Sequence, residues 1–307
     1  MLHSTSLSLK DHVFRWGERT YVMGVLNITS DSFSGDGLID SSVSSGITSK
    51  AEMLERALRQ AHRFVAAGVD VLDVGGESTR PGSQPVTVDE ELNRVIPVVR
   101  ALVSEFQTLI SIDTYKARVA EVALDAGAKL VNDVWGLRAD PDLASVVARR
   151  GVPVILMHNR SSWVHAEIRE QLGGRYIGME YSNLVEDICN ELMESVELAH
   201  LAGVADENII LDPGIGFGKT VEQNLELLNR LDEIRALGYP LLLGPSRKSF
   251  IGYTLNLPPE ERLEGTSAAV AIGIARGADI VRVHDVEAMT RVARMADAIT
   301  RRTPPIT

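Results

Sequence analysis

The sequence is poor in cysteine and contains no long apolar run. Its single cysteine, Cys189, excludes an internal disulfide and a zinc site built from cysteines. No apolar run reaches the ~18 residues that a membrane-spanning helix needs, and the N-terminal region lacks the apolar stretch of a signal peptide. We therefore expect a cytoplasmic protein that has no membrane partner.

Clusters of basic residues are also missing. The net charge is −11, and the lysine and arginine residues are scattered along the chain. A nucleic-acid partner would favour a basic face, so we expect no nucleic-acid partner. An acidic protein that binds an anion must instead gather a few cations, a metal ion or backbone amides at one place.

What the chain does have is apolar content for a large core. Of its 307 residues, 45% are hydrophobic and 24% are charged, as is typical of a folded globular protein. Eight nearly continuous apolar runs predict strands: Tyr21–Ile28, Val69–Gly75, Leu109–Asp113, Leu130–Val134, Pro153–His158, Ile209–Asp212, Pro240–Gly244 and Ile280–His284. Continuous rather than alternating runs indicate parallel strands that are buried on both faces.

Amphipathic patterns between these runs predict helices over Ala51–Ala67, Glu90–Phe106, Ala117–Ala126, Leu184–Ala202, Val221–Leu237 and Thr266–Arg276. Several of the helical patterns end at a glycine just before the next strand, as expected for helix C-termini. Right-handed βαβ crossovers then follow. Eight such units close a (β/α)8 TIM barrel, and we expect one domain over residues 1–307.

A doubly wound open sheet is the alternative architecture, because it also alternates strands and helices. Its functional residues would gather in one glycine-rich first turn, whereas here polar residues follow nearly every strand, which favours the barrel. Residues 1–20 are predicted as an N-terminal strand or hairpin that closes the barrel bottom. Two long segments, Ser34–Ser49 and Asn159–Tyr181, are predicted as lids or binding loops.

Polar residues at the strand ends form two chemical groups. The first combines carboxylates, an amide and an ammonium group with two apolar side chains: Asp113, Asn132, Asp212, Lys248, Met157 and Phe217. A buried carboxylate can accept paired N–H bonds from a guanidine-like ring edge, and a lysine can donate to a ring carbonyl. Methionine and phenylalanine can cover the ring faces. This group indicates a site for a flat, nitrogen-rich heterocycle.

The second group consists of hydrogen-bond donors that suit a phosphate or pyrophosphate: Thr79, Arg80, Arg282, His284 and the Gly75–Gly76 turn. Asn27, close to Asp31, offers hard oxygen ligands of the kind that Mg²⁺ uses together with a substrate phosphate. The glycines of Gly214–Gly218 are interpreted as a tight turn, and Lys219 after them as a solvated charge. The predicted pocket therefore holds a heterocycle at depth and a phosphate at its rim.

Eight motifs occur in an order and spacing that resembles the dihydropteroate synthase family: MGVLNITSDSF, DVGGESTRPG, SIDTYKARVA, VNDVWG, LMH, LDPGIGFGKT, GPSRKSFIG and RVHDV. The resemblance runs from about Tyr21 to the last helix. It implies a transferase of folate biosynthesis that joins 6-hydroxymethyl-7,8-dihydropterin pyrophosphate to p-aminobenzoate and releases pyrophosphate. It also implies a homodimer.

The resemblance further implies roles for individual residues. The residues implied to hold the pterin are Asp113, Asn132, Asp212 and Lys248. Those implied to donate to the pyrophosphate are Thr79, Arg80, Arg282 and His284, while Asn27 meets Mg²⁺. Those implied to line the p-aminobenzoate site are Ser246, Arg247, Lys248 and Pro81. The residues expected to carry the chemistry are Asp113, Lys248, Arg80 and Arg282.

Two other functions stay open. Methyltetrahydrofolate:corrinoid methyltransferases have a related barrel and a similar Asp/Asn/Asp pterin pocket, but they move a methyl group. Arg80, Lys248 and Arg282 argue against this activity, since it leaves no pyrophosphate to hold. The other alternative is a paralogue that binds pterin without catalysis, because a shared fold does not secure a function. The presence of Asn27, Arg80 and Lys248 weighs against it.

Overall fold

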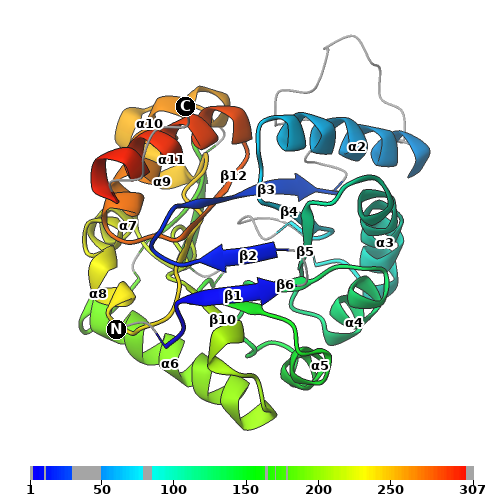
Figure 1. The fold of residues 1–307 in the computed structure, drawn as a ribbon. Coiled ribbons are helices and arrows are strands. Elements are labelled where there is room, and N and C mark those ends of the chain that lie inside the picture. Colours follow the sequence, from blue (N-terminus) through cyan, green and yellow to red (C-terminus); the bar gives the residue numbers. More distant parts are fainter. Residues whose placement is uncertain are drawn as a thin grey trace.

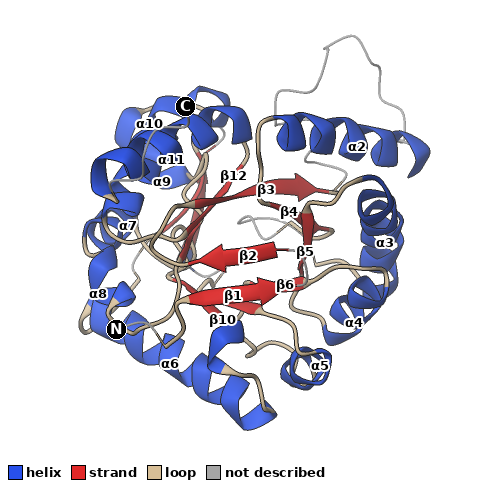
Figure 2. Ribbon diagram, viewed as in Figure 1, coloured by secondary structure: helices blue, strands red, loops and turns tan. Residues whose placement is uncertain are grey.

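The computed structural model describes residues 3–9, 12–29, 50–78, 85–162, 165–169, 171–177 and 179–301. Eight parallel strands form a ring with helices outside it (Figures 1 and 2). In sheet order they are β10 (Ile209–Asp212), β7 (Val154–Met157), β6 (Leu130–Asp133), β5 (Leu109–Asp113), β4 (Val71–Gly75), β3 (Tyr21–Asn27), β12 (Ile280–Val283) and β11 (Leu242–Leu243). A parallel bridge between Leu211 and Leu241 joins the two edges. The predicted barrel is confirmed.

Each predicted strand overlaps an observed one, because the apolar runs are buried as expected. Every residue of β4, β6, β7 and β10 is buried. Helices cover the outer face of the ring, and side chains from neighbouring strands fill its interior. This double burial is the reason that the strands show apolar runs without a polar alternation.

A hairpin closes one end of the barrel, as predicted. It consists of β1 (Ser6–Leu9) and β2 (His12–Arg15), which pair antiparallel across the ring (Figure 1). Leu7, Phe14 and Trp16 are buried in the same cluster as the inward-facing residues of the barrel strands. Burying side chains of this size stabilises the fold by about 1.5–3 kcal/mol each. The hairpin therefore plugs the bottom and leaves the other end for a site.

The outer ring consists of helices α2 (Lys50–Ala66), α3 (Val88–Glu105), α4 (Ala117–Asp125), α5 (Leu143–Arg150), α6 (Leu184–Ala202), α7 (Val221–Asn229), α8 (Leu231–Arg235), α9 (Ser249–Leu255), α10 (Leu263–Ala275) and α11 (Val286–Thr300). The prediction of one helix over Val221–Leu237 is wrong: the helix breaks at Arg230, with φ −108° and ψ 23°, into α7 and α8. Within the described ranges, no helix combines the length and the apolar character that crossing a membrane requires.

The long segment Asn159–Tyr181 contains a second antiparallel pair, β8 (Ala166–Arg169) and β9 (Gly173–Tyr176). It lies against α9, where the Tyr253 hydroxyl donates to the carbonyl of Gly173 at 3.2 Å. The buried Arg262 donates to the carbonyl of Leu172 at 3.0 Å. A role for this segment as a lid stays a prediction, and the other predicted lid, Ser34–Ser49, lies outside the described residues.

Candidate active site

The carboxyl ends of the strands bring the predicted site residues to the end of the barrel opposite the hairpin. In the parallel register, Asp113 stands beside Asn132 and Gly75. Met157 stands beside Asp212. Because neighbouring parallel strands end at the same level, these residues share one mouth, which is where barrel enzymes carry their chemistry.

Arg282 links several of these residues. Its Nε donates to Oδ2 of Asp73 at 2.6 Å, and its Nη2 donates to Oδ2 of Asp113 at 2.6 Å. Asn132 donates from Nδ2 to the same oxygen of Asp73 at 3.0 Å. The strand-end pattern predicts Arg282 in the pyrophosphate group and Asp113 in the heterocycle group, but in the structure the two side chains are bonded directly. Arg282 therefore lies at the boundary between the two predicted halves of the site.

Asp73 is a site residue that the sequence analysis missed. It lies inside β4 and is completely buried, and its Oδ1 has no hydrogen-bond partner among the described residues. A buried carboxylate is costly unless cations or donors compensate it. The signal that could have found it is a charged residue within the otherwise apolar strand Val71–Gly75.

Burial changes the acidity of Asp113. Desolvation raises the pKa of this carboxyl to about 7, although Arg282 opposes the shift and the charge of Asp73 adds to it. A carboxyl with such a pKa changes its charge near neutral pH. Perturbed groups of this kind gather at functional sites.

Asp212, Phe217 and Lys248 meet above the end of β10. Asp212 is buried, and its Oδ1 accepts the N–H of Gly214 at 2.7 Å. Burial raises its pKa, while Lys248 and the Gly214 N–H oppose the shift. Lys248 donates to the carbonyl of Ile215, and its Nζ lies 4.5 Å from the centre of the Phe217 ring. Desolvation lowers the pKa of Lys248 to about 8.

Ser246 and His284 lie after the neighbouring strands β11 and β12. The Ser246 hydroxyl accepts the backbone N–H of His284 at 3.2 Å and lies 3.1 Å from its Nδ1. The adjacent Arg247 has a φ of 55°, which is unusual for a residue with a side chain. Arg262 donates to the carbonyl of Arg247 at 2.9 Å, and the guanidinium of Arg247 pairs with Asp285. Backbone strain that surrounding bonds hold in place is frequent at functional sites.

The interpretation of Lys219 as a solvated charge is wrong. Lys219 is only 1% exposed, and its Nζ lies 2.9 Å from Nδ1 of His158. It also donates to the carbonyls of Gly214 and Phe217, at 3.0 Å each. The sequence conceals this because the glycine turn folds back over the lysine. His158 and its neighbour Glu191, 3.2 Å from His158 Nε2, were missed for the same reason.

Three of the predicted residues, Thr79, Arg80 and Pro81, lie outside the described residues, as does Asp31. The described chain on either side of residues 79–84 is held by Lys116. This buried lysine pairs with Glu77, and donates to the carbonyl of Val86 at 2.9 Å and to Glu91 at 2.6 Å. Both flanks of the segment are thus fixed to Lys116, the residue directly before α4. Asn27 ends β3, beside Gly75.

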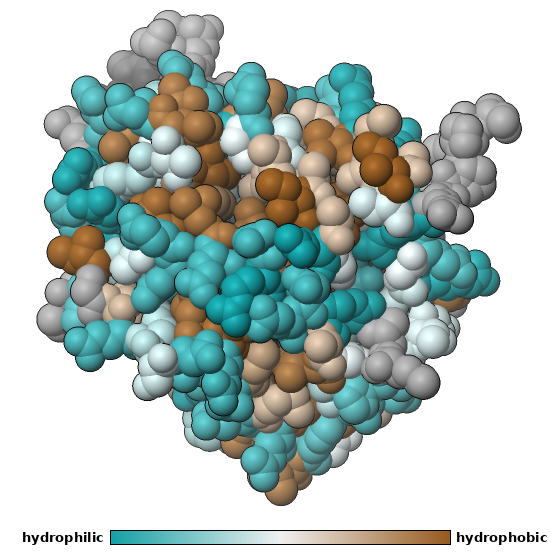
Figure 3. Space-filling view, turned by 90° about the vertical axis from the view of Figure 1, so that its left-hand side faces the viewer, coloured by the Kyte–Doolittle hydropathy of each residue, from teal (hydrophilic) through white to brown (hydrophobic). Residues whose placement is uncertain are grey.

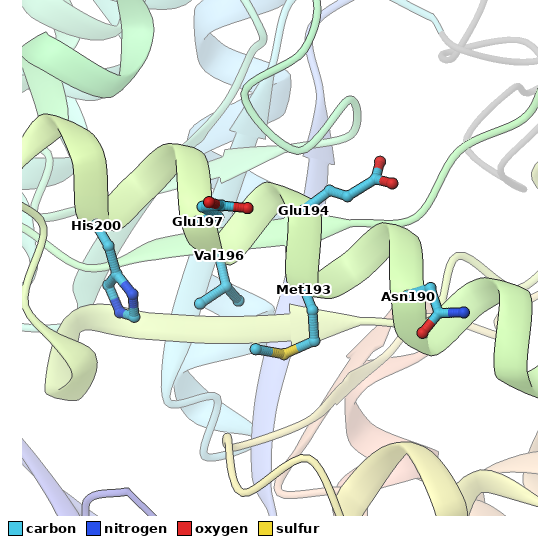
Figure 4. Close-up of a pocket in the computed structure, with 6 residues that line it drawn as sticks. All are labelled: Asn190, Met193, Glu194, Val196, Glu197 and His200. Carbon is cyan, nitrogen blue, oxygen red and sulfur yellow. The ribbon is translucent and has the colours of Figure 1, made fainter.

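A separate pocket lies along α6 (Figure 4). Its lining residues are Asn190, Met193, Glu194, Val196, Glu197 and His200. All of them come from one helix, and none is a residue that the sequence analysis selected. The candidate active site is therefore the barrel mouth and not this pocket.

Comparisons with known proteins show what the whole chain is similar to. Residues 23–284 match the family described as "Pterin binding enzyme". The chain is 51% identical over 290 residues to a dihydropteroate synthase of Clostridium beijerinckii, covering 94% of this chain and 97% of the relative. The solved dihydropteroate synthase of Clostridium difficile, in the presence of pteroic acid, is 48% identical with a TM-score of 0.81, covering 94% of this chain and 99% of that one. The enzyme of Xanthomonas albilineans with 4-aminobenzoic acid is 35% identical with a TM-score of 0.82, covering 98% and 100%.

Proposed function

The chain belongs to the dihydropteroate synthase family of pterin-binding enzymes, which are transferases of folate biosynthesis, and from this membership we propose the reaction and the role of each site residue. The enzyme joins 6-hydroxymethyl-7,8-dihydropterin pyrophosphate to p-aminobenzoate and releases pyrophosphate. The observation that carries the proposal is the convergence of buried carboxylates, Arg282 and Lys248 at the strand ends. This donor and acceptor set suits a heterocycle bearing a charged leaving group.

The pterin ring occupies the deeper part of the mouth. One oxygen of Asp212 accepts the N–H of Gly214. The other lone pairs of the carboxylate stay open to the N–H groups of a ring edge. Asn132 and Asp113 contribute further polar groups from neighbouring strands. The buried Met157 and the ring of Phe217 supply apolar contacts.

The pyrophosphate lies toward Arg282 and the residues around it. The guanidinium has five N–H donors, and two of them bond Asp73 and Asp113. Within the described ranges the other three are available for phosphate oxygens. Because both carboxylates fix the orientation of Arg282, its remaining donors are preorganised for charge that develops on the leaving group.

The reaction is a displacement at the exocyclic CH₂ carbon. The C–O bond to pyrophosphate breaks largely before the arylamine arrives, because the electron-rich pterin stabilises the developing positive charge. The carboxylate of Asp113 adds electrostatic stabilisation from the strand end. An arylamine needs no strong base to attack such a centre. The position of His158 agrees with this, because the residue is buried and its Nδ1 contacts Lys219.

We propose Mg²⁺ as the cofactor, with Asn27 as a protein ligand. Among the residues that the structure describes, no three or more His, Cys, Asp or Glu side chains are grouped to hold a metal ion. Magnesium at phosphate sites needs few protein ligands, because waters and substrate phosphates complete its shell. The amide oxygen of Asn27 at the end of β3 fits that requirement. Bound there, the ion would stabilise the charge on the leaving pyrophosphate.

A homodimer is the assembly we propose. Large apolar side chains are exposed on α10 and α11: Leu263, Ile272, Met295 and Ile299, at 38%, 48%, 63% and 68%. Figure 3 shows the corresponding side of the molecule, with apolar surface gathered in its upper half. Exposed apolar side chains that gather on one side of a protein favour an interaction surface there. Ile299→Arg should shift a dimer toward monomer in sedimentation velocity, and an unchanged mass would contradict this face.

The reaction is tested by a coupled assay for pyrophosphate release with the pterin pyrophosphate, p-aminobenzoate and Mg²⁺. Release that requires both substrates, with dihydropteroate identified by mass spectrometry, supports the proposal. A pterin-binding paralogue would bind the pterin without release. A methyltransferase would release no pyrophosphate and would transfer a methyl group instead.

A further inference from the structure

Lys219 has a buried amino group that the proposed reaction does not use, and burial lowers the pKa of this group well below its usual value. Its Nζ bridges two loops, because it contacts the ring of His158 after β7 and the carbonyls of Gly214 and Phe217 after β10. A lysine buried to this degree needs compensating partners, since an isolated charge in the interior is costly. The contacts to three acceptors hold the side chain of Lys219 in one position between the two loops.

The two loops that Lys219 joins lie in backbone contact. Gly214 has a φ of 70°, and a Cβ at this position would overlap the carbonyl oxygen of His158. Gly218 has a φ of 61°, and a Cβ there would overlap the carbonyl carbon of Arg160. Only glycine fits both the conformation and the space at these positions. The contact is therefore a closely packed seam, with Lys219 at its centre.

The loop over Gly214–Gly218 carries the groups that define one side of the proposed pterin site. The Gly214 N–H orients Asp212, and the carbonyl of Ile215 accepts Lys248. The ring of Phe217 lies against the same lysine. By holding the carbonyls of Gly214 and Phe217, Lys219 fixes the start and the end of this stretch. A shift of the loop would move all three groups together.

On the other side, the seam continues to α6. His158 Nε2 lies 3.2 Å from Oε2 of Glu191, and Arg160 Nε donates to Oε1 of Glu191 at 2.7 Å. Burial lowers the pKa of His158 to about 4, and the positive charge of Lys219 adds to the shift. The neutral ring accepts Lys219 at Nδ1, which leaves the hydrogen on Nε2, facing Glu191. The lysine is thus connected through His158 to a fixed helix.

We propose that Lys219 is a positioning residue of the active site, which locks the Gly214–Gly218 loop to His158 so that Asp212, Phe217 and Lys248 meet the pterin. This inference rests on the proposed function. Lys219 does not touch the reacting atoms, so its removal should weaken recognition of the pterin substrate more than that of p-aminobenzoate. A lysine with a purely structural role would change stability without separating the two substrates.

The test is steady-state kinetics of Lys219→Met, which keeps the length and apolar stem of the side chain and removes its donors. We expect KM for the pterin pyrophosphate to rise about tenfold or more, as loss of a buried group that donates to three acceptors predicts. KM for p-aminobenzoate should change by less than about threefold. The matched control is Lys129→Met, at the hairpin end of the barrel just before β6, where both constants should stay unchanged. Equal changes in both constants, or no change, would overturn the inference.

A double-mutant cycle adds a second readout. If Lys219 acts through His158, the effects of Lys219→Met and His158→Leu on the pterin KM should be less than additive. Full additivity would overturn the bridging role. If circular dichroism shows that Lys219→Met does not fold, Lys219→Gln, which retains an N–H donor, is measured for the same separation of the two constants and decides in its place.

Titration with free 6-hydroxymethyl-dihydropterin separates this inference from the proposed function. A wild-type protein that binds the pterin but releases no pyrophosphate would contradict the function and leave the role of Lys219 to be decided by the dissociation constant of the variant. An active wild type with an unchanged pterin constant in the variant would overturn the inference alone. A wild type that neither binds the pterin nor releases pyrophosphate would overturn both.

Discussion

At the hairpin end of the barrel, Asp279 accepts the backbone N–H groups of Gly17 and Leu241 at 3.2 and 3.0 Å, and Arg235 lies 3.2 Å from it. At the mouth, Asp113 accepts Arg282 and, within the described chain, no backbone N–H. Burial raises the pKa of both carboxyl groups. Burial and charge therefore do not distinguish these two carboxylates. Their donors do, because Asp279 accepts backbone N–H groups beside Arg235, whereas Asp113 accepts a side chain.

Backbone donors join elements of the fold, whereas side-chain donors can also face a ligand. Asp279 connects the turn after β2 to the strand β11, so its bonds stabilise the closed bottom. The donor of Asp113 is a guanidinium with N–H groups to spare. We therefore expect the charge of Asp279 to serve the stability of the bottom and that of Asp113 to serve binding and catalysis, as their positions along the barrel strands suggest.

The largest expected effect comes from replacing the arginine at each end. Arg282→Ala should lower turnover by about 10²–10³, as removal of one preorganised donor does. Arg235→Ala should instead lower the melting temperature and leave turnover per folded molecule unchanged, since its partner Asp279 belongs to the bottom. Kinetics and thermal unfolding of both variants measure the contrast. An Arg282 variant that keeps its turnover but binds free pterin weakly would make this arginine only a wall of the pocket.

The next effect is a pH dependence that only the mouth should show in catalysis. The folded pKa of Asp113 is raised from 3.8 to about 7, so its carboxylate is charged only as the pH rises through this value. We expect kcat/KM to rise with pH through about 7, and Asp113→Asn to remove this rise. A profile that is identical in wild type and variant would mean that the carboxylate is not required in its charged form.

The same shift has a consequence for stability. A raised folded pKa means that the folded protein binds the Asp113 proton more tightly than the unfolded chain. The stability this proton contributes is full below the unfolded value and is lost as the pH rises through about 7. Between pH 5 and 8 the melting temperature of Asp113→Asn should therefore fall less than that of the wild type. A parallel decline would contradict the raised pKa.

The smallest expected effect compares two hydroxyl groups. Ser246→Ala removes the acceptor of the His284 N–H at the mouth, and should raise KM for p-aminobenzoate several-fold, as loss of about 1 kcal/mol predicts. Thr20→Val removes the hydroxyl that donates to Asp297 at 2.7 Å near the bottom. It should cost about 1–3 kcal/mol of the free energy of unfolding, with no change in either KM. A shift of KM in the Thr20 variant would break the division between the two ends.

The barrel was predictable because buried parallel strands produce apolar runs, and because their ends must meet at one mouth. The break between helices α7 and α8 at Arg230 was not predictable, since no glycine or proline marks it. At the site, the candidate residues at the strand ends were selected by this rule, although His158, directly after β7, was not. Asp73 was missed because it lies inside a strand, and Lys219 because its partners depend on the path of two loops. The acceptor that a long side chain reaches depends on three-dimensional packing. The residues next to it in the sequence do not predict this packing.

The most direct test of the account is calorimetric titration of free 6-hydroxymethyl-dihydropterin into wild type and Asp212→Asn. Asp212 is buried at the end of β10, where its carboxylate can pair with the N–H groups of a ring edge. Losing one charge-assisted bond should cost about 1.5–3 kcal/mol, which raises the dissociation constant by about 10–150-fold. We expect this weaker binding of the pterin, with the fold of the variant retained. An unchanged dissociation constant would make Asp212 a structural residue and would place the pterin elsewhere.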